Sequence, residues 1–136
     1  MINITRRERF NAAHKLWNPE WSEQQNREVF GVCANIHGHN WELFVTVKGE
    51  VNPETGFVIN FKTLSEIIKH EIIQHVDHTY LNEDVAFMKG KLTSAENFAI
   101  EIWKILKPAI EDHYNATLHY IKLTETENHY VEYFGE

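Results

Sequence analysis

The stretch that decides the fold is HGHNWELFVTVK, residues 37–48. Apolar side chains occupy every second position from Trp41 to Val47, with mostly polar side chains between them. Because successive side chains of a strand point to opposite faces of a sheet, this alternation predicts a β-strand with one buried face. The same rule places His37 and His39 together on one face at the start of the strand.

Upstream, segment 2–14 shows a similar alternation and is predicted to be another strand. Segment 15–35 has no clean period and contains turn-forming residues, so a long loop is expected, of the kind that often carries function. If the two strands pair antiparallel across this loop, the end of the first lies beside the start of the second. That pairing would bring His14 close to His37 and His39.

Downstream, the apolar period changes to that of helices and then returns to two. The sequence predicts a short return strand, two helices that each start at a capping box, and two final strands: 57–61, a helix from Thr63 (box Thr63/Glu66) to near Gln74, a helix from Thr93 (box Thr93/Glu96) to near Pro108, 118–124 and 130–134. Strand pairs at both ends with helices between them are typical of an antiparallel α+β layer. Since a small open sheet leaves unpaired edges, association of identical subunits is one way to cover them.

The composition narrows the classes of function. The chain has 136 residues, 13 Lys and Arg against 20 Asp and Glu, and a formal net charge of −7. This length suits one domain, and the acidic balance disfavours nucleic acid and anionic membranes as partners. The N-terminus carries charge where a signal peptide would be apolar, and no apolar run approaches the roughly 18 residues of a membrane span. A single cysteine excludes an internal disulfide, so a reducing cytoplasm is expected.

Nine histidines accompany that single cysteine, so histidine is the expected ligand of any metal. His37 and His39 share a strand face, Gly38 between them does not crowd the approach, and His14 is expected beside them. Three neutral imidazoles suit Zn²⁺, and a three-ligand site keeps a fourth position open for water or substrate, as catalytic sites do. The alternative is that His-Gly-His is a surface coincidence and His14 a satisfied core histidine.

Three further groups are candidates for chemistry. Cys33 lies four residues before His37, where a nearby cation would favour its thiolate as base, nucleophile or fourth ligand; the alternative is an ordinary half-buried cysteine. Asp77-His78 is either a carboxylate that orients an imidazole for proton transfer or only a turn. Glu125, at the end of the fourth strand, either accepts two hydrogen bonds from an amidine-like N–H pair or is a solvated acid. The other histidines are expected at the surface or at an interface: His70, His75, His113, His119 and His129.

Several motifs match one known family, in order along the chain: FNAAH at 10–14, Cys33 followed by HGHN at 37–40, Asp77-His78 with Leu81-Asn82, SAEN at 94–97, and Glu125-Thr126. Together they resemble the 6-pyruvoyl-tetrahydropterin synthase / 6-carboxytetrahydropterin synthase family over essentially the whole chain, which implies one pterin synthase domain, residues 1–136. The family's tunnelling fold is a four-stranded antiparallel sheet, ordered ββααββ, with two helices on one face. Three subunits close a barrel and two trimers stack, so the resemblance implies a homohexamer.

The resemblance also assigns roles to single residues. It implies the following site: His14, His37 and His39 as zinc ligands, Cys33 as the proton-abstracting base, Asp77 and His78 as its partners from a neighbouring subunit, Glu125 as the anchor of the pterin ring, and Glu96 at the border of the pterin pocket. For Glu96, a capping role is the simpler alternative. On this resemblance Cys33, the only cysteine of the chain, is the leading catalytic candidate.

The implied substrate is 7,8-dihydroneopterin triphosphate, whose side-chain hydroxyls zinc would bind and acidify. Within the family, carboxy synthases cleave the side chain, release acetaldehyde and feed queuosine and other deazapurines, whereas pyruvoyl synthases keep it and feed tetrahydrobiopterin. The three residues between Cys33 and His37 resemble bacterial carboxy synthases, while residues 45–50 and Asn60 look more like the pyruvoyl branch. The carboxy synthase is therefore the primary expectation and the pyruvoyl synthase the alternative.

Two other functions stay open on the sequence. One is a non-catalytic, zinc-stabilised binding module with the same fold. The other is a different pterin or purine enzyme, such as a cyclohydrolase or aldolase relative, against which the three histidines and Cys33 argue. No glycine-rich loop is present to hold the triphosphate, so scattered cations at subunit interfaces or helix N-termini are expected to do so.

Overall fold

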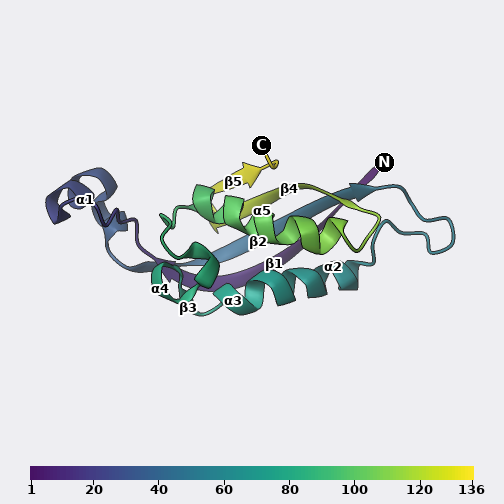
Figure 1. Ribbon diagram of the computed structural model, residues 1–136, viewed down its shortest axis with the longest axis horizontal. Helices are drawn as coiled ribbons and strands as arrows, with labels where there is room; N and C mark the ends of the chain where they lie inside the picture. Colours follow the sequence, from purple (N-terminus) through teal and green to yellow (C-terminus); the bar gives the residue numbers. More distant parts are fainter.

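A twisted sheet forms the centre of the computed structural model, which describes residues 1–136 (Figure 1). Its strand order is β3-β1-β2-β4-β5. The strands span β1 Ile2–His14, β2 His37–Gly49, β3 Thr79–Tyr80, β4 Thr117–Thr126 and β5 His129–Tyr133. The four longer strands pair antiparallel, as predicted. The two-residue β3 runs parallel to β1 and was not predicted, because so short a strand shows no alternation.

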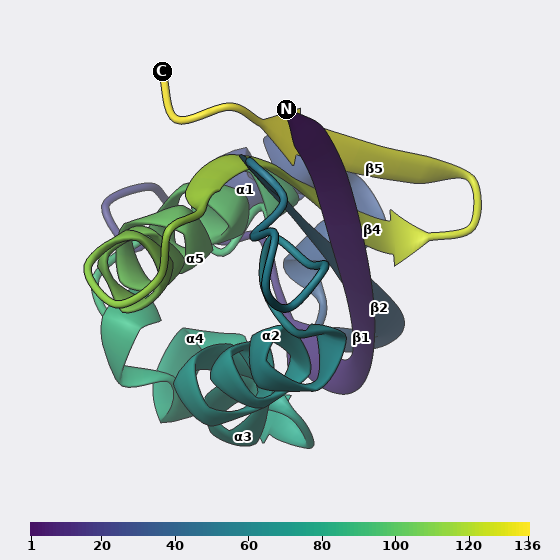
Figure 2. The same ribbon diagram turned by 90° about the vertical axis from the view of Figure 1, so that its right-hand side faces the viewer.

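Two long helical segments cover one face of this sheet (Figure 2). The helical elements are α1 Glu23–Phe30, the 3₁₀ turn η1 Gly31–Ala34, α2 Phe61–Ile68, the π-helical stretch η2 Lys69–Ile73, α3 Gln74–Val76, α4 Leu81–Asp84, the 3₁₀ turn η3 Ala86–Met88 and α5 Ala95–Glu111. α2, η2 and α3 follow one another without a break, so the first predicted helix extends to Val76. None of the helices combines the length and the apolar character needed to span a lipid bilayer.

The core lies between the sheet and these helices. Trp41, at the start of the predicted buried face of β2, is fully buried, as are the other apolar side chains of that face. Its indole stacks on Phe10 of β1 at 5.9 Å between ring centroids, and Phe98 of α5 meets it edge-on at 5.4 Å. The helices add fully buried Leu64 from α2 and Ile102 from α5. The period-two pattern of residues 37–48 therefore identified the sheet face on which the helices pack.

Segment 15–35 is not entirely loop, because it contains α1 and η1. Ser22 starts α1, with its hydroxyl accepting a hydrogen bond from the backbone N–H of Gln25. Asn26 is the only buried residue of α1, and its amide donates to the carbonyl of Asn18 at 2.9 Å. A helix with so little apolar surface has no helical stripe to predict it. In Figure 1, α1 projects from one end of the molecule.

The predicted helix starts were displaced. Asn60, not Thr63, caps α2 by accepting from the N–H of Lys62, and Ser94, not Thr93, caps α5 by accepting from the N–H of Asn97. Residues 57–61, predicted as a strand, instead lead into the α2 cap.

The predicted end of the second long helix was also one turn short. α5 continues past Pro108 to Glu111. A proline within a helix removes one backbone hydrogen bond, which is a cost. The extra turn buries Ile110 completely in the core, and this apolar burial offsets the lost hydrogen bond.

Candidate metal centre and adjoining cleft

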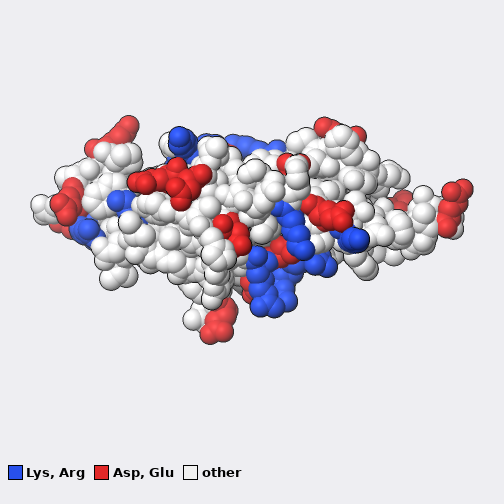
Figure 3. Space-filling model, turned by 90° about the horizontal axis from the view of Figure 1, so that it is seen from below, with Lys and Arg blue, Asp and Glu red and all other residues white.

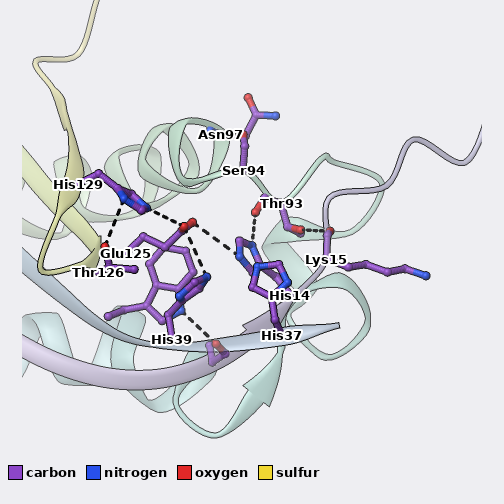
Figure 4. Close-up of polar contacts among 12 residues, drawn as sticks. His14, Lys15, His37, His39, Thr93, Ser94, Asn97, Glu125, Thr126 and His129 are labelled. Atoms are coloured by element: carbon purple, nitrogen blue, oxygen red, sulfur yellow. Dashed lines mark hydrogen bonds and ion pairs between the residues drawn. The ribbon is translucent and has the colours of Figure 1, made fainter. Parts of the chain in front are cut away.

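Three histidines converge where β1 ends and β2 begins (Figure 4). The antiparallel register pairs His14 directly with His37, and Ala12 with His39, which confirms the predicted pairing of these strands. One ring nitrogen from each of the three imidazoles lies within 4.8 Å of the other two. Because His14, His37 and His39 come from two adjacent strands in fixed register, the sheet itself holds them together.

Two backbone carbonyls fix which nitrogens face the centre of this cluster. Nδ1 of His14 lies 2.7 Å from the carbonyl of Thr93, and Nδ1 of His37 lies 2.7 Å from the carbonyl of Asn35. A carbonyl can only accept, so both Nδ1 atoms donate and both Nε2 atoms keep a free lone pair. Such second contacts are the usual way in which proteins orient metal-binding histidines.

The chemistry of this set suits a divalent metal. Nε2 of His14 and Nε2 of His39 are buried and have no hydrogen-bond partner. Burial lowers the pKa of both imidazoles below the usual histidine value, which favours the neutral form that binds metal. Buried nitrogens without a partner need an explanation in a native protein, and binding of a metal ion would supply one. His14, His37 and His39 could therefore hold a metal.

A carboxylate lies beside the cluster. Thr124 of β4 pairs with Tyr130 and Thr126 pairs with His129, so Glu125 lies in a β-bulge between them. Its Oε1 is 3.5 Å from Nε2 of His39, its Oε2 is 3.7 Å from Nε2 of His14, and its side chain is 19% exposed. Bulges often re-aim a side chain next to an active site. Here the bulge directs the carboxylate toward the histidines.

An open cleft of about 490 Å³ adjoins this carboxylate. Two acidic residues line it, Glu125 from β4 and Glu96 from the first turn of α5. Its apolar lining includes Leu16, Phe30 and Val131. Because Ser94 caps α5 through Asn97, the expected capping box does not form and Glu96 is free of that role. Apolar walls with acidic groups suit a flat heteroaromatic ring that carries N–H donors.

Cys33 lies in η1, on the segment that joins the two histidine-bearing strands. It is half-buried and its thiol is free. Its carbonyl accepts a hydrogen bond from the N–H of Leu16 at 2.8 Å, which ties η1 to the chain two residues after His14. The cysteine is thus connected to the histidine cluster through the backbone.

Asp77 and His78 follow α3 and pack against β1. The Asp77 carboxylate accepts from the backbone N–H of Asn11 at 2.9 Å and lies 3.0 Å from Nδ1 of His78. The hydrogen bond from Asn11 holds the pKa of Asp77 below the usual aspartate value. His78 has a positive φ of 61°, a strained conformation, and its N–H donates to the Asn11 carbonyl at 2.6 Å.

The imidazole of His78 does not reach the cleft that holds Glu125. It is 78% exposed and lines a different hollow of about 340 Å³, whose lining also includes His39 of the cluster and its neighbours Gly38 and Asn40. Within one chain the structure thus brings together the three histidines and Glu125, and it leaves Asp77 and His78 facing outward.

The hydrogen bonds that hold the backbone next to His14 were not predicted from the sequence. The side-chain amide of Asn82 forms two hydrogen bonds with the backbone of Lys15, to its N–H and its carbonyl, both at 3.0 Å. The hydroxyl of Thr93 lies 3.0 Å from that same carbonyl and from the Asn82 oxygen. Asn82 belongs to a motif quoted above, but nothing in the local sequence indicates that its amide fastens the end of β1.

A second unpredicted residue is His129, at the start of β5. Its Nε2 lies 3.0 Å from Oε1 of Glu125. A histidine four residues after a strand-end glutamate gives no signal in the sequence, because the contact depends on the tight turn and the bulge.

The fold is of the α+β class. Its histidine cluster, open toward an acidic cleft, is a candidate metal centre of the kind found in catalytic sites. Comparison with known proteins agrees. The sequence model of the family described as 6-pyruvoyl tetrahydropterin synthase matches residues 3–136. The chain belongs to this family and is a lyase of it.

Individual relatives cover nearly the full chain. The 6-pyruvoyl tetrahydrobiopterin synthase of Dictyostelium discoideum is 40% identical over 135 residues, covering 99% of this chain and 97% of its own. The human protein of the same name is 36% identical, covering 98% and 91%. The solved structure of Caenorhabditis elegans 6-pyruvoyl tetrahydropterin synthase superposes with a TM-score of 0.91 at 32% identity, covering 99% and 96%.

The carboxy branch is more distant. The 6-carboxy-5,6,7,8-tetrahydropterin synthase of Rickettsia bellii is 26% identical over 148 residues, covering 97% of this chain and 99% of its own. The comparisons therefore favour the alternative expectation, the pyruvoyl branch, over the primary one. The short spacing between Cys33 and His37 favoured the carboxy branch. This spacing is a weak indicator of the branch, because loop length changes easily without a change in chemistry.

Proposed function

We propose that the protein is a zinc-dependent 6-pyruvoyl tetrahydropterin synthase, which eliminates triphosphate from 7,8-dihydroneopterin triphosphate and keeps the three-carbon side chain. The observation that carries the proposal is the cluster of His14, His37 and His39 beside the acidic cleft, in which the buried Nε2 atoms of His14 and His39 have no hydrogen-bond partner. The identities of 36–40% to proteins named 6-pyruvoyl tetrahydrobiopterin synthase support the choice of branch.

His14, His37 and His39 would hold the zinc through their free ring nitrogens. When bound, zinc supplies a Lewis acid that lowers the pKa of coordinated hydroxyl groups. Glu125 would accept hydrogen bonds from the amidine-like N–H groups of the pterin and so fix the ring in the cleft. Glu96 would border the ring from the first turn of α5. A substrate held in this way presents its side chain to the histidine cluster.

Cys33 and His78 would move the protons. In this proposal the Cys33 thiolate abstracts a proton from the substrate side chain. Asp77 orients His78 through Nδ1, leaving Nε2 to exchange a proton. Because His78 faces outward and away from the Glu125 cleft, its partner site belongs to a neighbouring subunit. The proposal accordingly includes association of subunits, as a homohexamer of two trimers. It also includes a cytoplasmic location, as expected for a chain with a single cysteine.

The reaction product tests the branch. Purified protein incubated with 7,8-dihydroneopterin triphosphate is expected to release triphosphate and form the 6-pyruvoyl product without acetaldehyde. Acetaldehyde with a carboxylated pterin would instead identify a carboxy synthase. Absence of turnover in zinc-loaded protein would overturn the proposed activity and favour a binding module.

Two variants test the assigned roles in the same assay. Cys33→Ala is expected to lower kcat by about 100-fold or more, the usual effect of removing an acid–base group, with zinc content and assembly unchanged. Glu125→Gln is expected mainly to raise KM, because the amide cannot accept both hydrogen bonds from the ring. Full activity of Cys33→Ala would contradict the catalytic role.

A further inference from the structure

We propose that His129 is a positioning residue, which holds the Glu125 carboxylate in place for the substrate. The inference rests on the proposed role of Glu125 as the anchor of the pterin ring. His129 is exposed, as expected of a histidine at the surface or at an interface, and it also lines the cleft that Glu125 and Glu96 share.

The hairpin between β4 and β5 fixes the orientation of this imidazole. Thr126 and His129 pair across a two-residue turn, and Oγ1 of Thr126 lies 3.2 Å from Nδ1 of His129. The same Oγ1 accepts a hydrogen bond from the N–H of Asn128, so its own hydrogen is free to be donated to Nδ1. Nδ1 then accepts and Nε2 carries the proton that is donated to Glu125, at 3.0 Å.

Glu125 lies between the histidine cluster and His129 (Figure 4). Its Oε2 faces His14 at 3.7 Å, whereas its Oε1 faces both His39, at 3.5 Å, and His129, at 3.0 Å. A divalent cation held by the histidine cluster would draw the carboxylate toward itself. The hydrogen bond from His129 acts from the side away from His14. It thus keeps the carboxylate at the cleft, where it can meet the ring.

A structural role alone does not explain this contact. The His129 side chain is 61% exposed, and polar contacts of exposed side chains contribute little to stability. The substitution His129→Leu is therefore expected to fold normally. His129→Gln keeps an N–H donor close to the position of Nε2. His113, an exposed histidine just after α5, provides the matched control His113→Leu.

Steady-state kinetics on the zinc-loaded protein separate these variants. His129→Leu is expected to raise KM for 7,8-dihydroneopterin triphosphate by about tenfold, the value of one hydrogen bond to a charged group, with kcat within about twofold. His129→Gln and His113→Leu are expected to stay within about twofold of the wild type in both. Zinc content should be equal in all four proteins.

Two readouts do not require turnover. Neopterin, followed by its fluorescence, should bind His129→Leu about tenfold more weakly than the wild type. In cobalt(II)-loaded protein, the visible spectrum of His129→Leu should shift as the released carboxylate approaches the metal, while His129→Gln keeps the wild-type spectrum.

An unchanged KM or neopterin affinity in His129→Leu, a failure of His129→Gln to restore them, or an unchanged cobalt spectrum would overturn the proposal. A wild type that binds neopterin but does not turn over would count against the proposed function alone. In that case the neopterin titrations of the variants still decide the role of His129.

Discussion

Glu101 is a buried carboxylate that ties the segment before α5 to the helix itself. It accepts from Lys104 at 2.8 Å, one turn along α5, and from Lys91 at 2.5 Å, outside the helix. The hydrogen bonds from Lys104 and Lys91 hold the pKa of Glu101 below the usual glutamate value. Lys91 lies two residues before Thr93, whose carbonyl orients His14. The ion pairs of Glu101 thus stabilise the backbone behind the histidine cluster.

The substitution Glu101→Gln is expected to lower the free energy of unfolding at pH 7 by about 1 kcal/mol. A carboxyl whose pKa is depressed on folding stabilises the protein above its unfolded pKa, about 4.3, and loses this effect as pH falls through the folded value. The difference between wild type and variant should therefore shrink below about pH 4. Denaturant unfolding across pH measures it, with exposed Glu54→Gln as control. A pH-independent difference would contradict the ion-pair explanation.

Residue by residue, the sequence predicted the centre of the site better than its surroundings. His14, His37 and His39 could be predicted because period-two alternation and antiparallel pairing fix where strand residues lie. The place of Glu125 could not, since it depends on a bulge that leaves no pattern in the sequence. The same limit applies to His129, whose contact exists only once the β4–β5 turn has formed.

Helix starts were the least predictable feature at the level of elements. Thr63 has the expected glutamate three residues later, yet Asn60 is the residue with extended φ and ψ whose side chain caps α2. Both are capping residue types, so composition alone does not choose between them. In the structure the chain is already helical at Phe61, and Leu64 and Ile68 of this helix are buried in the core.

Asn60→Ala is expected to lower the free energy of unfolding by about 1 kcal/mol, the usual cost of losing a cap. Thr63→Ala should change it by less than about 0.5 kcal/mol, because its hydroxyl has no capping role in the structure. Urea denaturation followed by circular dichroism compares the pair. Equal effects of the two substitutions, or a larger effect at Thr63, would show that the cap is misassigned.

The molecule as a whole leaves sheet edge and apolar surface uncovered. β3 covers β1 only at Ala12 and Ala13, so the rest of that edge is unpaired, and β5 forms the other edge. Figure 3 shows the molecule from below the view of Figure 1. On this face, basic and acidic side chains lie close together near the middle. Near Cys33, the apolar side chains of Val32 and Ile36 are 82% and 63% exposed. Open edges and exposed apolar groups favour association.

Sedimentation of the purified protein is expected to give a mass that is a multiple of three chains, in line with the proposed assembly. Val32→Glu should reduce this mass, because a charge in an apolar contact must be desolvated. Thr55→Glu, in the exposed turn after β2, adds the same charge elsewhere and should leave the mass unchanged. A wild-type monomer at micromolar concentration would refute the assembly.

The pairing of His14 with His37 has a consequence for folding. These residues bracket segment 15–36, so an ion bound to both would close that segment into a loop, much as a cross-link does. Closing a loop of this size removes chain entropy from the unfolded state worth about 3 kcal/mol for a covalent link. Ala34 is the only buried apolar residue of this segment, which carries α1 and Cys33, so the segment would owe much of its order to the ion that serves the chemistry. Catalytic competence and resistance to unfolding would rise and fall together with metal supply.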